Sequence, residues 1–355
     1  MSIGSCVRRV ILAGACVWTA SSAAAAQDSL TQGSIEQFYK GRSIQVVVGS
    51  SAGGGYDTYA RLLGRYFGSH IPGNPTIVPQ NMSGAGSNRA AGFIYSVAPK
   101  DGTAIGALFP GAVLQTLLGD TPVQHDPSKF NYLGSANNDV YICFLRADAP
   151  AKSLQDALTT ETILGASNPG ATTYDLPAVL NSVLGTKFRI VTGYPGSREL
   201  TLAVERGEVQ GACGIGWTGL INFYPEWFTK GFIKVIAQVS LAGHPDLDKA
   251  GVPLATQLAK TDEDRLVLEL VFSQGMFGRP FVLPPGVPPE RVTALRQAFL
   301  ASLRDKGLLA EADKMRLDVE PISGEDLQTL VTRLYASPKN VIERARQALT
   351  AKPQR

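Results

Sequence analysis

The chain has 355 residues, of which 44% are hydrophobic and 18% are charged, a composition typical of a globular protein rather than a disordered one. This length is enough for two lobes of ordinary domain size, each with its own core. The formal net charge of +3 is too small to indicate a nucleic-acid-binding surface, so we expect no nucleic-acid partner.

Residues 1–26 have the pattern of a secretory signal peptide. Two arginines precede a short apolar run, and small residues then lead to an Ala-x-Ala exit before Gln27. A membrane anchor is one alternative, but the apolar run is short and is diluted by threonine and serine. A lipoprotein anchored through Cys16 is another, because residues 13–15 resemble a lipobox that lacks its usual leucine. We expect cleavage at the exit and a mature chain in the periplasm.

Removal of this segment takes away two arginines and no acidic residue, so the formal charge falls from +3 to +1. Two of the four cysteines remain, Cys143 and Cys213. An extracytoplasmic compartment permits a disulfide. The sequence leaves open whether these two cysteines are bridged or are separate buried thiols.

Segments typical of strands and helices alternate along the mature chain. Residues 44–48 form a β-branched run, and after a glycine-rich loop the apolar residues of 59–67 recur with helical spacing. A second cycle follows, with a strand at 76–79, a helix at 88–97 and a strand at 103–108. Such alternation predicts a parallel sheet.

The middle of the chain repeats this pattern and predicts a second lobe. Its expected strands are 140–145, 162–166, 188–191, 209–213 and 233–239. We therefore predict an α/β chain of two Rossmann-like lobes, in which residues 27–133 and 243–355 form lobe 1 and residues 134–242 form lobe 2. Two crossings, near Tyr132 and Ala242, would make a two-strand hinge.

The first glycine-rich loop allows a hydrolase interpretation. Residues 49–53 read Gly-Ser-Ser-Ala-Gly, which matches the nucleophile elbow of serine hydrolases with Ser51 as the nucleophile. Such an enzyme also needs a histidine base and an acid. His244 follows Ser51 in the chain but lies in what reads as a polar turn, and no strand precedes the loop to supply an oxyanion hole. A secreted esterase that uses Ser51 stays an alternative, and we expect no catalytic residue.

Neither a nucleotide site nor a metal site is predicted. The glycines do not follow the G-x-G-x-x-G spacing of dinucleotide-binding loops, and no Gly-Lys-Ser or Gly-Lys-Thr follows them. The three histidines are scattered and form no ligand cluster with the cysteines. We expect no cofactor and no metal.

The position of the glycines favours an anion-binding site. Residues 53–55 lie between a strand and an amphipathic helix, where backbone N–H groups can approach a ligand at a helix N-terminus. Residues 83–88 repeat this arrangement after the next strand, and parallel strands would place the two loops side by side. The alternative is that both are tight turns, in which Asp57 and Ser87 or Asn88 cap the helices.

Several stretches resemble the receptors of the tripartite tricarboxylate transporters, the TctC-like and Bug extracytoplasmic solute-binding proteins. Residues 53–61 are similar to the GGG-x-D-x-x-A-R signature of that family, and residues 81–88 to its N-R-P-G-A-G-G-N loop. Further resemblances follow in the order of the family over most of the mature chain. They lie at 98–103, 165–172, 194–197, 207–210 and 284–288.

The resemblance implies a type II periplasmic binding protein, or Venus flytrap, whose lobes close on a small organic acid without making or breaking a bond. It implies a carboxylate ligand, membrane transporter subunits as partners and a monomer. An orphan receptor that signals to a sensor is a further alternative.

The resemblance also implies ligand-binding residues in both lobes. In lobe 1 these are Ser51, Gly54, Tyr56, Asp57, Ser83, Ala85, Gly86, Ser87 and Asn88. In lobe 2 they are Gly170, Thr172, Thr173, Tyr194, Gly196, Ser197 and Arg198. Since Asp57 is negative, we expect it to cap the helix or hold a water. Arg198 either meets a second ligand carboxylate or is solvated. Trp217 and Phe109 either line the ligand site or belong to the core.

Overall fold

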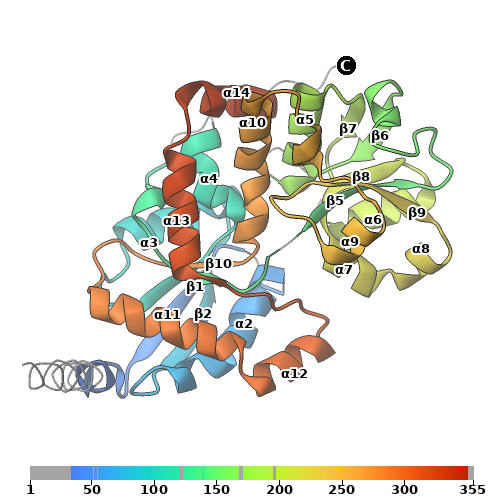
Figure 1. Cartoon of the computed structure of the whole chain (residues 1–355). Helices are drawn as coiled ribbons and strands as arrows, with labels where there is room; N and C mark the ends of the chain where they lie inside the picture. The colour runs from blue at the N-terminus through green and yellow to red at the C-terminus, as the bar shows by residue number, and fades with distance from the viewer. Residues whose placement is uncertain are drawn as a thin grey trace, which may run out of the picture.

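The computed structural model describes residues 33–50, 52–53, 55–119, 123–138, 140–167, 171–194 and 197–350. The expected signal peptide lies outside these ranges, as do Ser51, Gly54, Gly170 and Gly196 of the expected site. The strands of the described residues form two separate mixed sheets flanked by helices (Figure 1). This arrangement confirms the predicted α/β class.

The first sheet has six strands in the order β11-β4-β10-β3-β1-β2. Strands β1 to β4 run parallel to one another, and β10 and β11 run in the opposite direction. The strands are β1 (Ser43–Val48), β2 (Thr76–Asn81), β3 (Ala104–Ala107), β4 (Asn131–Ser135), β10 (Pro280–Leu283) and β11 (Ile322–Ser323). The three strands predicted from residue 44 to residue 108 are all present, with bounds that differ by one or two residues.

Both faces of the first sheet are covered, because neighbouring side chains of a strand point to opposite faces. Val46 and Val48 join a core with one group of helices, and Val47 joins the core on the other face. The helices of the first group are α2 (Gly55–Phe67), α11 (Pro289–Leu303) and α12 (Lys306–Lys314). Those of the second are α3 (Asn88–Ser96), α4 (Pro110–Leu118) and α13 (Gly324–Tyr335).

The second sheet has five strands in the order β7-β6-β8-β5-β9. Strands β6, β7 and β8 are parallel, and β5 pairs antiparallel with both β8 and β9. They are β5 (Tyr141–Arg146), β6 (Thr162–Gly165), β7 (Phe188–Val191), β8 (Gly211–Gly216) and β9 (Ile233–Gln238). One face packs on α6 (Ser197–Arg206), α7 (Trp217–Phe223), α8 (Pro225–Thr229) and α9 (Pro245–Lys249), and the other on α5 (Thr172–Leu184).

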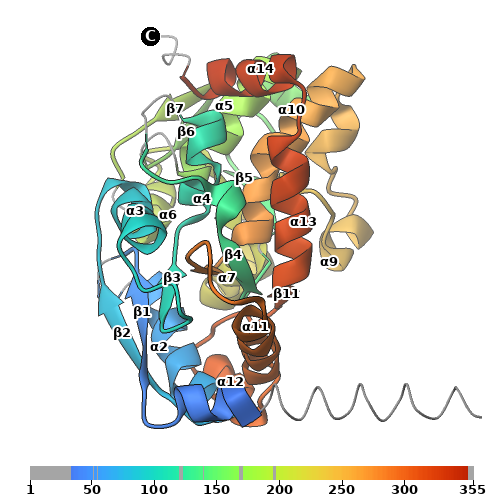
Figure 2. The same ribbon diagram turned by 90° about the vertical axis from the view of Figure 1, so that its left-hand side faces the viewer.

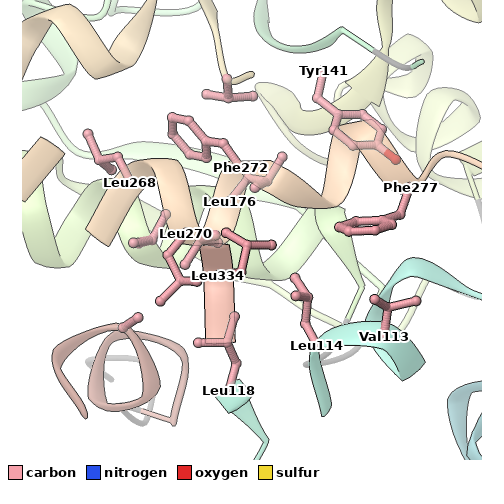
Figure 3. Close-up of a cluster of buried hydrophobic side chains, with 14 of the residues drawn as sticks. Val113, Leu114, Leu118, Tyr141, Leu176, Leu268, Leu270, Phe272, Phe277 and Leu334 are labelled. Atoms are coloured by element: carbon pink, nitrogen blue, oxygen red, sulfur yellow. The ribbon is translucent and has the colours of Figure 1, made fainter. Parts of the chain in front are cut away.

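The core on the α3, α4 and α13 face of the first sheet also covers the α5 face of the second sheet and so joins the two lobes. Helices α10 (Asp262–Phe272) and α14 (Lys339–Thr350) both contact α5, and in Figures 1 and 2 α14 lies across one end of the molecule above them. Figure 3 shows Leu118 of α4, Leu176 of α5 and Phe272 of α10 within this cluster. The expectation of one core per lobe was therefore incomplete, since this shared core contains buried residues of both sheets.

The chain crosses between the sheets twice. The first crossing is the short segment between Ser135 of β4 and Tyr141 of β5. After β9 the chain stays with the second sheet, since Leu247 is buried in its core and Leu254 forms a parallel bridge with Gln238. We therefore propose that the return to lobe 1 lies beyond Leu254, later than the Ala242 expected from the sequence.

Cys143 and Cys213 form a disulfide, which decides between the two alternatives that the sequence left open. They lie opposite each other on the antiparallel strands β5 and β8, and both are fully buried. The bridge ties together two central strands of the second sheet.

Among the described residues, no helix is long and apolar enough to cross a membrane.

Replacing both cysteines by alanine should lower the free energy of unfolding by about 2–4 kcal/mol, because the bridge closes a loop with a sequence separation of 70 residues. Urea unfolding of the two proteins measures the difference. Dithiothreitol should destabilise the wild type toward the level of the variant and leave the variant unchanged. An equal response of both proteins to the reductant would contradict the bridge.

Candidate functional site

The candidate site lies where the strands of each sheet end. Strands β1 to β4 end at one edge of the first sheet, and β6 to β9 end at one edge of the second, where β5 begins. Open α/β sheets bind ligands at this carboxyl edge. The segment between Ser135 and Tyr141 joins the two edges and extends at most about 20 Å, so the edges lie close together at the crossing.

Asp57 holds the first glycine-rich loop in place. Its Oδ2 accepts hydrogen bonds from the Gly53 amide at 2.8 Å and from Nε of Arg61 at 2.9 Å. Its Oδ1 accepts from Nδ2 of Asn81 at 2.9 Å, and the same Asn81 amide donates to the Ser50 carbonyl at 3.0 Å. The buried carboxylate therefore links the loop after β1, the first turns of α2 and the end of β2.

These contacts keep Asp57 ionised. The hydrogen bond from Arg61 is the largest influence, and with the Gly53 and Asn81 donors it lowers the pKa of Asp57 to about 2 against the opposing effect of burial. The carboxylate is occupied by three protein donors, and Arg61 balances its charge. Asp57 thus holds the loop after β1 in place, and because Arg61 pairs with it, it adds no net negative charge to the carboxyl edge of the first sheet.

The second glycine-rich loop turns sharply between β2 and α3. Four consecutive residues have positive φ, at 129° for Gly84, 47° for Ala85, 59° for Gly86 and 75° for Ser87. Two of these are not glycine, and such backbone strain is concentrated at functional sites. Helix α3 then begins at Asn88 without a side-chain cap, and its N-terminus faces the carboxyl edge. The amides of Ser87 and Asn88 donate to the carbonyls of Gly84 and Ala85.

Two polar atoms at the start of α3 are buried without a hydrogen-bond partner in the described part of the chain, namely Oγ of Ser87 and Oδ1 of Asn88. Ser87 is only 1% exposed and lies against Gly49 at the end of β1. A Cβ atom on Gly49 would be 1.7 Å from the Ser87 hydroxyl, so glycine is required at that position. Buried polar groups normally have partners, and a ligand or a water at this loop would supply them.

Aromatic rings and a cation extend the site along the same edge. The rings of Tyr56 and Phe109 are 4.3 Å apart, so Phe109, which follows β3, borders the first loop. The guanidinium carbon of Arg279, just before β10, lies 4.4 Å from the Tyr56 ring centre and 5.0 Å from that of Tyr59. Three chain segments far apart in sequence thus meet beside the start of α2.

The expected residues of lobe 2 lie at the carboxyl edge of the second sheet. Helix α5 begins at Thr172 without a side-chain cap. The Thr172 hydroxyl donates to the Gly214 carbonyl at 2.8 Å, and the Thr173 hydroxyl accepts from the Ser167 amide at 3.0 Å. The Thr173 hydroxyl therefore fixes the loop after β6, and the Thr172 hydroxyl ties the start of α5 to β8.

Three other expected residues follow β7. Tyr194 packs beside the core of α6 to α9, and burial raises the pKa of its phenol. Ser197 is the first residue of α6, and Arg198 is the next, although its side chain lies outside the description. Trp217 is 7% exposed and packs against Phe228 with ring centres 5.2 Å apart, so it belongs mainly to the core of lobe 2.

A segment of lobe 1 touches lobe 2 near these edges. Arg316 donates to the Asn222 carbonyl at 3.5 Å, and Asp318 interacts with Thr218 of α7. Burial raises the pKa of Asp318, and the contact with Thr218 opposes this effect. The Tyr59 hydroxyl donates to the Asp318 carbonyl at 2.7 Å, which ties the segment to α2.

The histidines are engaged away from the first loop. Nε2 of His70 lies 3.2 Å from Asp305, and Nε2 of His125 lies 3.1 Å from the Ala112 carbonyl. Nδ1 of His244 accepts from the amide two residues ahead. Within the described ranges, no group of three or more His, Cys, Asp or Glu side chains could hold a metal ion.

No protein-family model and no curated protein sequence matches the chain. Solved structures match it over most of its length. A TctC solute-binding protein from Polaromonas without ligand has a TM-score of 0.65 at 21% identity, covering 86% of this chain and 99% of that one. The periplasmic binding protein BugD has a TM-score of 0.60 at 21% identity, covering 87% and 98%. MatC from Rhodopseudomonas palustris, with bound malate, has a TM-score of 0.59 at 20% identity, covering 87% and 99%.

The chain has the fold of the TctC and Bug periplasmic binding proteins. This match confirms the predicted two-lobe type II fold. On the TctC-type fold, Tyr56, Asp57 and the loop from Ser83 to Asn88 lie at the edge of the first sheet. Thr172, Thr173, Tyr194 and Ser197 lie at the edge of the second.

Three residues of this edge were missing from the expected site. Asn81 and Arg61 fall inside the two resembling motifs, and their amide and guanidinium groups were a signal that they could hold Asp57. Arg279 has no such signal, because it precedes a short strand more than 200 residues later. Only the antiparallel insertion of β10 between β3 and β4 brings it to the site.

The Asp57 network predicts a pH-dependent contribution to stability. Since the pKa of Asp57 is lowered, its contribution is complete above the ordinary carboxyl pKa and is lost as the pH falls toward about 2. The difference in unfolding free energy between wild type and Asp57→Asn should be about 2 kcal/mol larger at pH 6 than near pH 2. Urea unfolding at both pH values measures this difference.

The control is Asp262→Asn, because Asp262 is exposed and is also paired with an arginine. An equal pH response of the two variants would refute the stabilising role of the Asp57 hydrogen bonds.

The contact between Gly49 and Ser87 predicts a rescue experiment. Gly49→Ala should destabilise the protein by about 1–3 kcal/mol, because the new methyl group overlaps the Ser87 hydroxyl. Adding Ser87→Gly removes the overlap and suits the positive φ at that position, so the double variant should recover most of the loss. Thermal unfolding of the wild type, the single variant and the double variant measures the loss and its recovery. Additive losses would show that the two positions do not touch.

Proposed function

We propose that this chain is a periplasmic solute-binding receptor of the TctC and Bug type, which captures a small organic acid between its lobes and delivers it to membrane transporter subunits. The observation that carries this proposal is the start of α3, where an uncapped helix N-terminus meets buried polar atoms of Ser87 and Asn88 without partners. A helix N-terminus favours negative charge, and its free amides are natural donors to a carboxylate.

The ligand class follows from the charge of the edge and from the structural neighbours. Arg61 neutralises Asp57, so donors and partial positive charge dominate at the loops of lobe 1. Among the neighbours, MatC is described with malate and another R. palustris protein, with a TM-score of 0.60 at 21% identity, with adipate. Both ligands are dicarboxylates, which supports a carboxylate for this chain.

The proposed binding residues are those expected from the sequence, with roles refined by their contacts. Main-chain amides of Ala85 and Gly86 hold one ligand carboxylate, together with the loop that contains Ser51 and Gly54. The amides of Ser87 and Asn88 do not take part, because they donate to the carbonyls of Gly84 and Ala85. Tyr56 and Phe109 form an aromatic wall beside it. Across the gap, the start of α5 at Thr172 and Thr173 and the loop from Tyr194 to Ser197 close over the ligand.

Capture requires that the ligand binds the closed arrangement of the lobes more tightly than the open one. The apolar core shared by α4, α5, α10 and α14 is well placed to stay packed while the edges move. In this proposal the contacts of Arg316 and Asp318 with α7, which lie away from that core, form when the lobes close. A micromolar dissociation constant corresponds to about 8 kcal/mol, which donors from two loops and an aromatic wall can supply.

A ligand screen tests the proposal. The chain without residues 1–26 is mixed with mono-, di- and tricarboxylates and amino acids, and thermal unfolding is recorded. A ligand at about a thousandfold excess over its dissociation constant adds about 4 kcal/mol and raises the midpoint by several degrees. If no acid shifts the midpoint while an activated ester is turned over and Ser51→Ala abolishes turnover, the chain is an esterase instead.

A matched pair of variants tests the position of the carboxylate. Asn and Asp tolerate the positive φ of Ala85 equally well and differ in charge. Ala85→Asp should weaken binding of the identified acid at least tenfold through repulsion, and Ala85→Asn should keep it within about threefold. Calorimetric titration gives both values. Equal affinities would place the carboxylate elsewhere.

A further inference from the structure

Asp318 places an acidic side chain at the contact between the two lobes. It lies in the segment between α12 and β11, which belongs to lobe 1. The Tyr59 hydroxyl of α2 donates to the Asp318 carbonyl at 2.7 Å, and the neighbouring side chains of Leu317 and Val319 pack against the core around α2, α11 and α12. The main chain of Asp318 is thus fixed to lobe 1, while its side chain is directed away from that core.

Lobe 2 covers this side chain from the other side. Thr218 of α7 makes a hydrogen-bond contact with the Asp318 carboxyl group, and His244 at the start of α9 is close enough for its charge to act on it. In Figure 1, α7 and α9 lie on the side of lobe 2 that faces α2 and α12. Oδ2 of Asp318 is buried and has no hydrogen-bond partner within the described ranges.

An ionised Asp318 is poorly compensated in this position. Burial is the largest influence on its pKa and raises it, and repulsion from Glu320 on the same segment raises it further. The contact with Thr218 and the charge of His244 act in the opposite direction without cancelling these effects. A buried carboxylate without sufficient partners is unfavourable, so the neutral form is favoured here.

The other charged groups of this interface are engaged elsewhere. Arg316, on the same segment as Asp318, donates to the Asn222 carbonyl at 3.5 Å. Nδ1 of His244 accepts from the Asp246 amide and lies 3.9 Å from the Asp246 carboxylate. The interface therefore closes over Asp318 without a cation dedicated to it in the described part of the chain.

Separation of the lobes would change these surroundings. Thr218 and His244 move with lobe 2, and water takes their place beside the carboxyl group of Asp318. A hydrated aspartate has an ordinary pKa of about 4, so its pKa is higher in the closed arrangement than in the open one. Between these two pKa values, the closed arrangement binds more protons than the open one.

We propose that closure of the lobes takes up a proton at Asp318, so that the receptor holds its acid more tightly as the pH falls. This inference rests on the proposed receptor function. The strengthening begins as the pH falls through the pKa of the closed arrangement and is complete below about 4. Each unit by which closure raises the pKa strengthens binding about tenfold between these limits.

Calorimetric titration of the wild type and Asp318→Asn from pH 8 to pH 4.5 tests the inference. The probes are malate and adipate, with the tightest-binding acid of the screen above if neither binds. Asparagine resembles the protonated carboxyl group and stays neutral at every pH. The variant should therefore bind at least about threefold more tightly than the wild type at pH 8, and this ratio should fall as the pH is lowered. Protonation of the acid itself cancels from the ratio.

Proton uptake is measured directly by repeating the titrations in buffers that differ in their enthalpy of ionisation. At one or more pH values in this range, the wild type should take up at least about 0.3 proton more than Asp318→Asn. Thr218→Val removes the hydrogen bond to the carboxylate and keeps the shape of the side chain, so it should weaken binding more at pH 8 than at pH 4.5. A purely structural role of Asp318 would change neither the proton count nor the pH dependence.

Glu320→Gln provides the matched control, because it removes one negative charge from an exposed side chain of the same segment. Its affinities should stay within about twofold of the wild type, since exposed charges are screened. An affinity gain equal to that of Asp318→Asn would contradict the inference, because the loss of any nearby negative charge would then suffice. Thermal unfolding without ligand verifies that each variant is folded, and if Asp318→Asn is not folded, the proton uptake of Asp318→Ala decides.

The outcomes separate this inference from the receptor function. If acids bind but the wild type and Asp318→Asn take up equal numbers of protons at every pH, the inference is wrong and the receptor function stands. The same holds if the ratio of their affinities does not change with pH. If no acid in the wider screen binds the wild type, the receptor function fails and this inference fails with it.

Discussion

The short crossing between β4 and β5 is the constraint on which the candidate site depends. Because β5 begins at the edge where β6 to β9 end, the few residues between Ser135 and Tyr141 bring the carboxyl edges of both sheets together. A longer connection, or one from the other end of β4, would place the loops far apart. The glycine-rich turns of lobe 1 and the start of α5 can cooperate only because of this topology.

At the carboxyl edge of lobe 1, the charged side chains of Asp57 and Arg61 pair with each other and hold the main chain of the loop. Asp57 is the acidic residue of the first motif, yet Arg61 and Asn81 bind its carboxylate so completely that it acts as a brace for the loop. What stays available to a ligand is the partial positive charge of the helix starts. Such a site would attract an organic acid by fixed donors that need no rearrangement of charge.

The packing of the lobes is uneven, and this has consequences for motion. On one side, α10 and α14 pack on α5 of the second lobe, and the shared apolar core contains buried residues of both sheets. On the other, Arg316 and Asp318 make polar contacts with α7. The exposed contact of Arg316 can be exchanged for contacts with water at little net cost, so we expect the lobes to separate on that side first.

The sequence by itself determined the alternation of strands and helices, the glycine-rich loops and their place at strand ends. Short β-branched runs such as 44–48 and the helical spacing of 59–67 are local patterns, and their physical causes are local as well. The resemblance of the loops to one receptor family added the two-lobe fold, which the comparison with solved structures confirms.

Only the tertiary structure decided how distant parts of the chain meet. The pairing of Cys143 with Cys213 depends on the register of β5 against β8, which no local pattern encodes. The shared core depends on helices at the end of the chain that pack against α5. Arg279 reaches Tyr56 only because β10 inserts antiparallel beside β3, and contacts of such large sequence separation follow from the packing of whole elements rather than from the residues around each position.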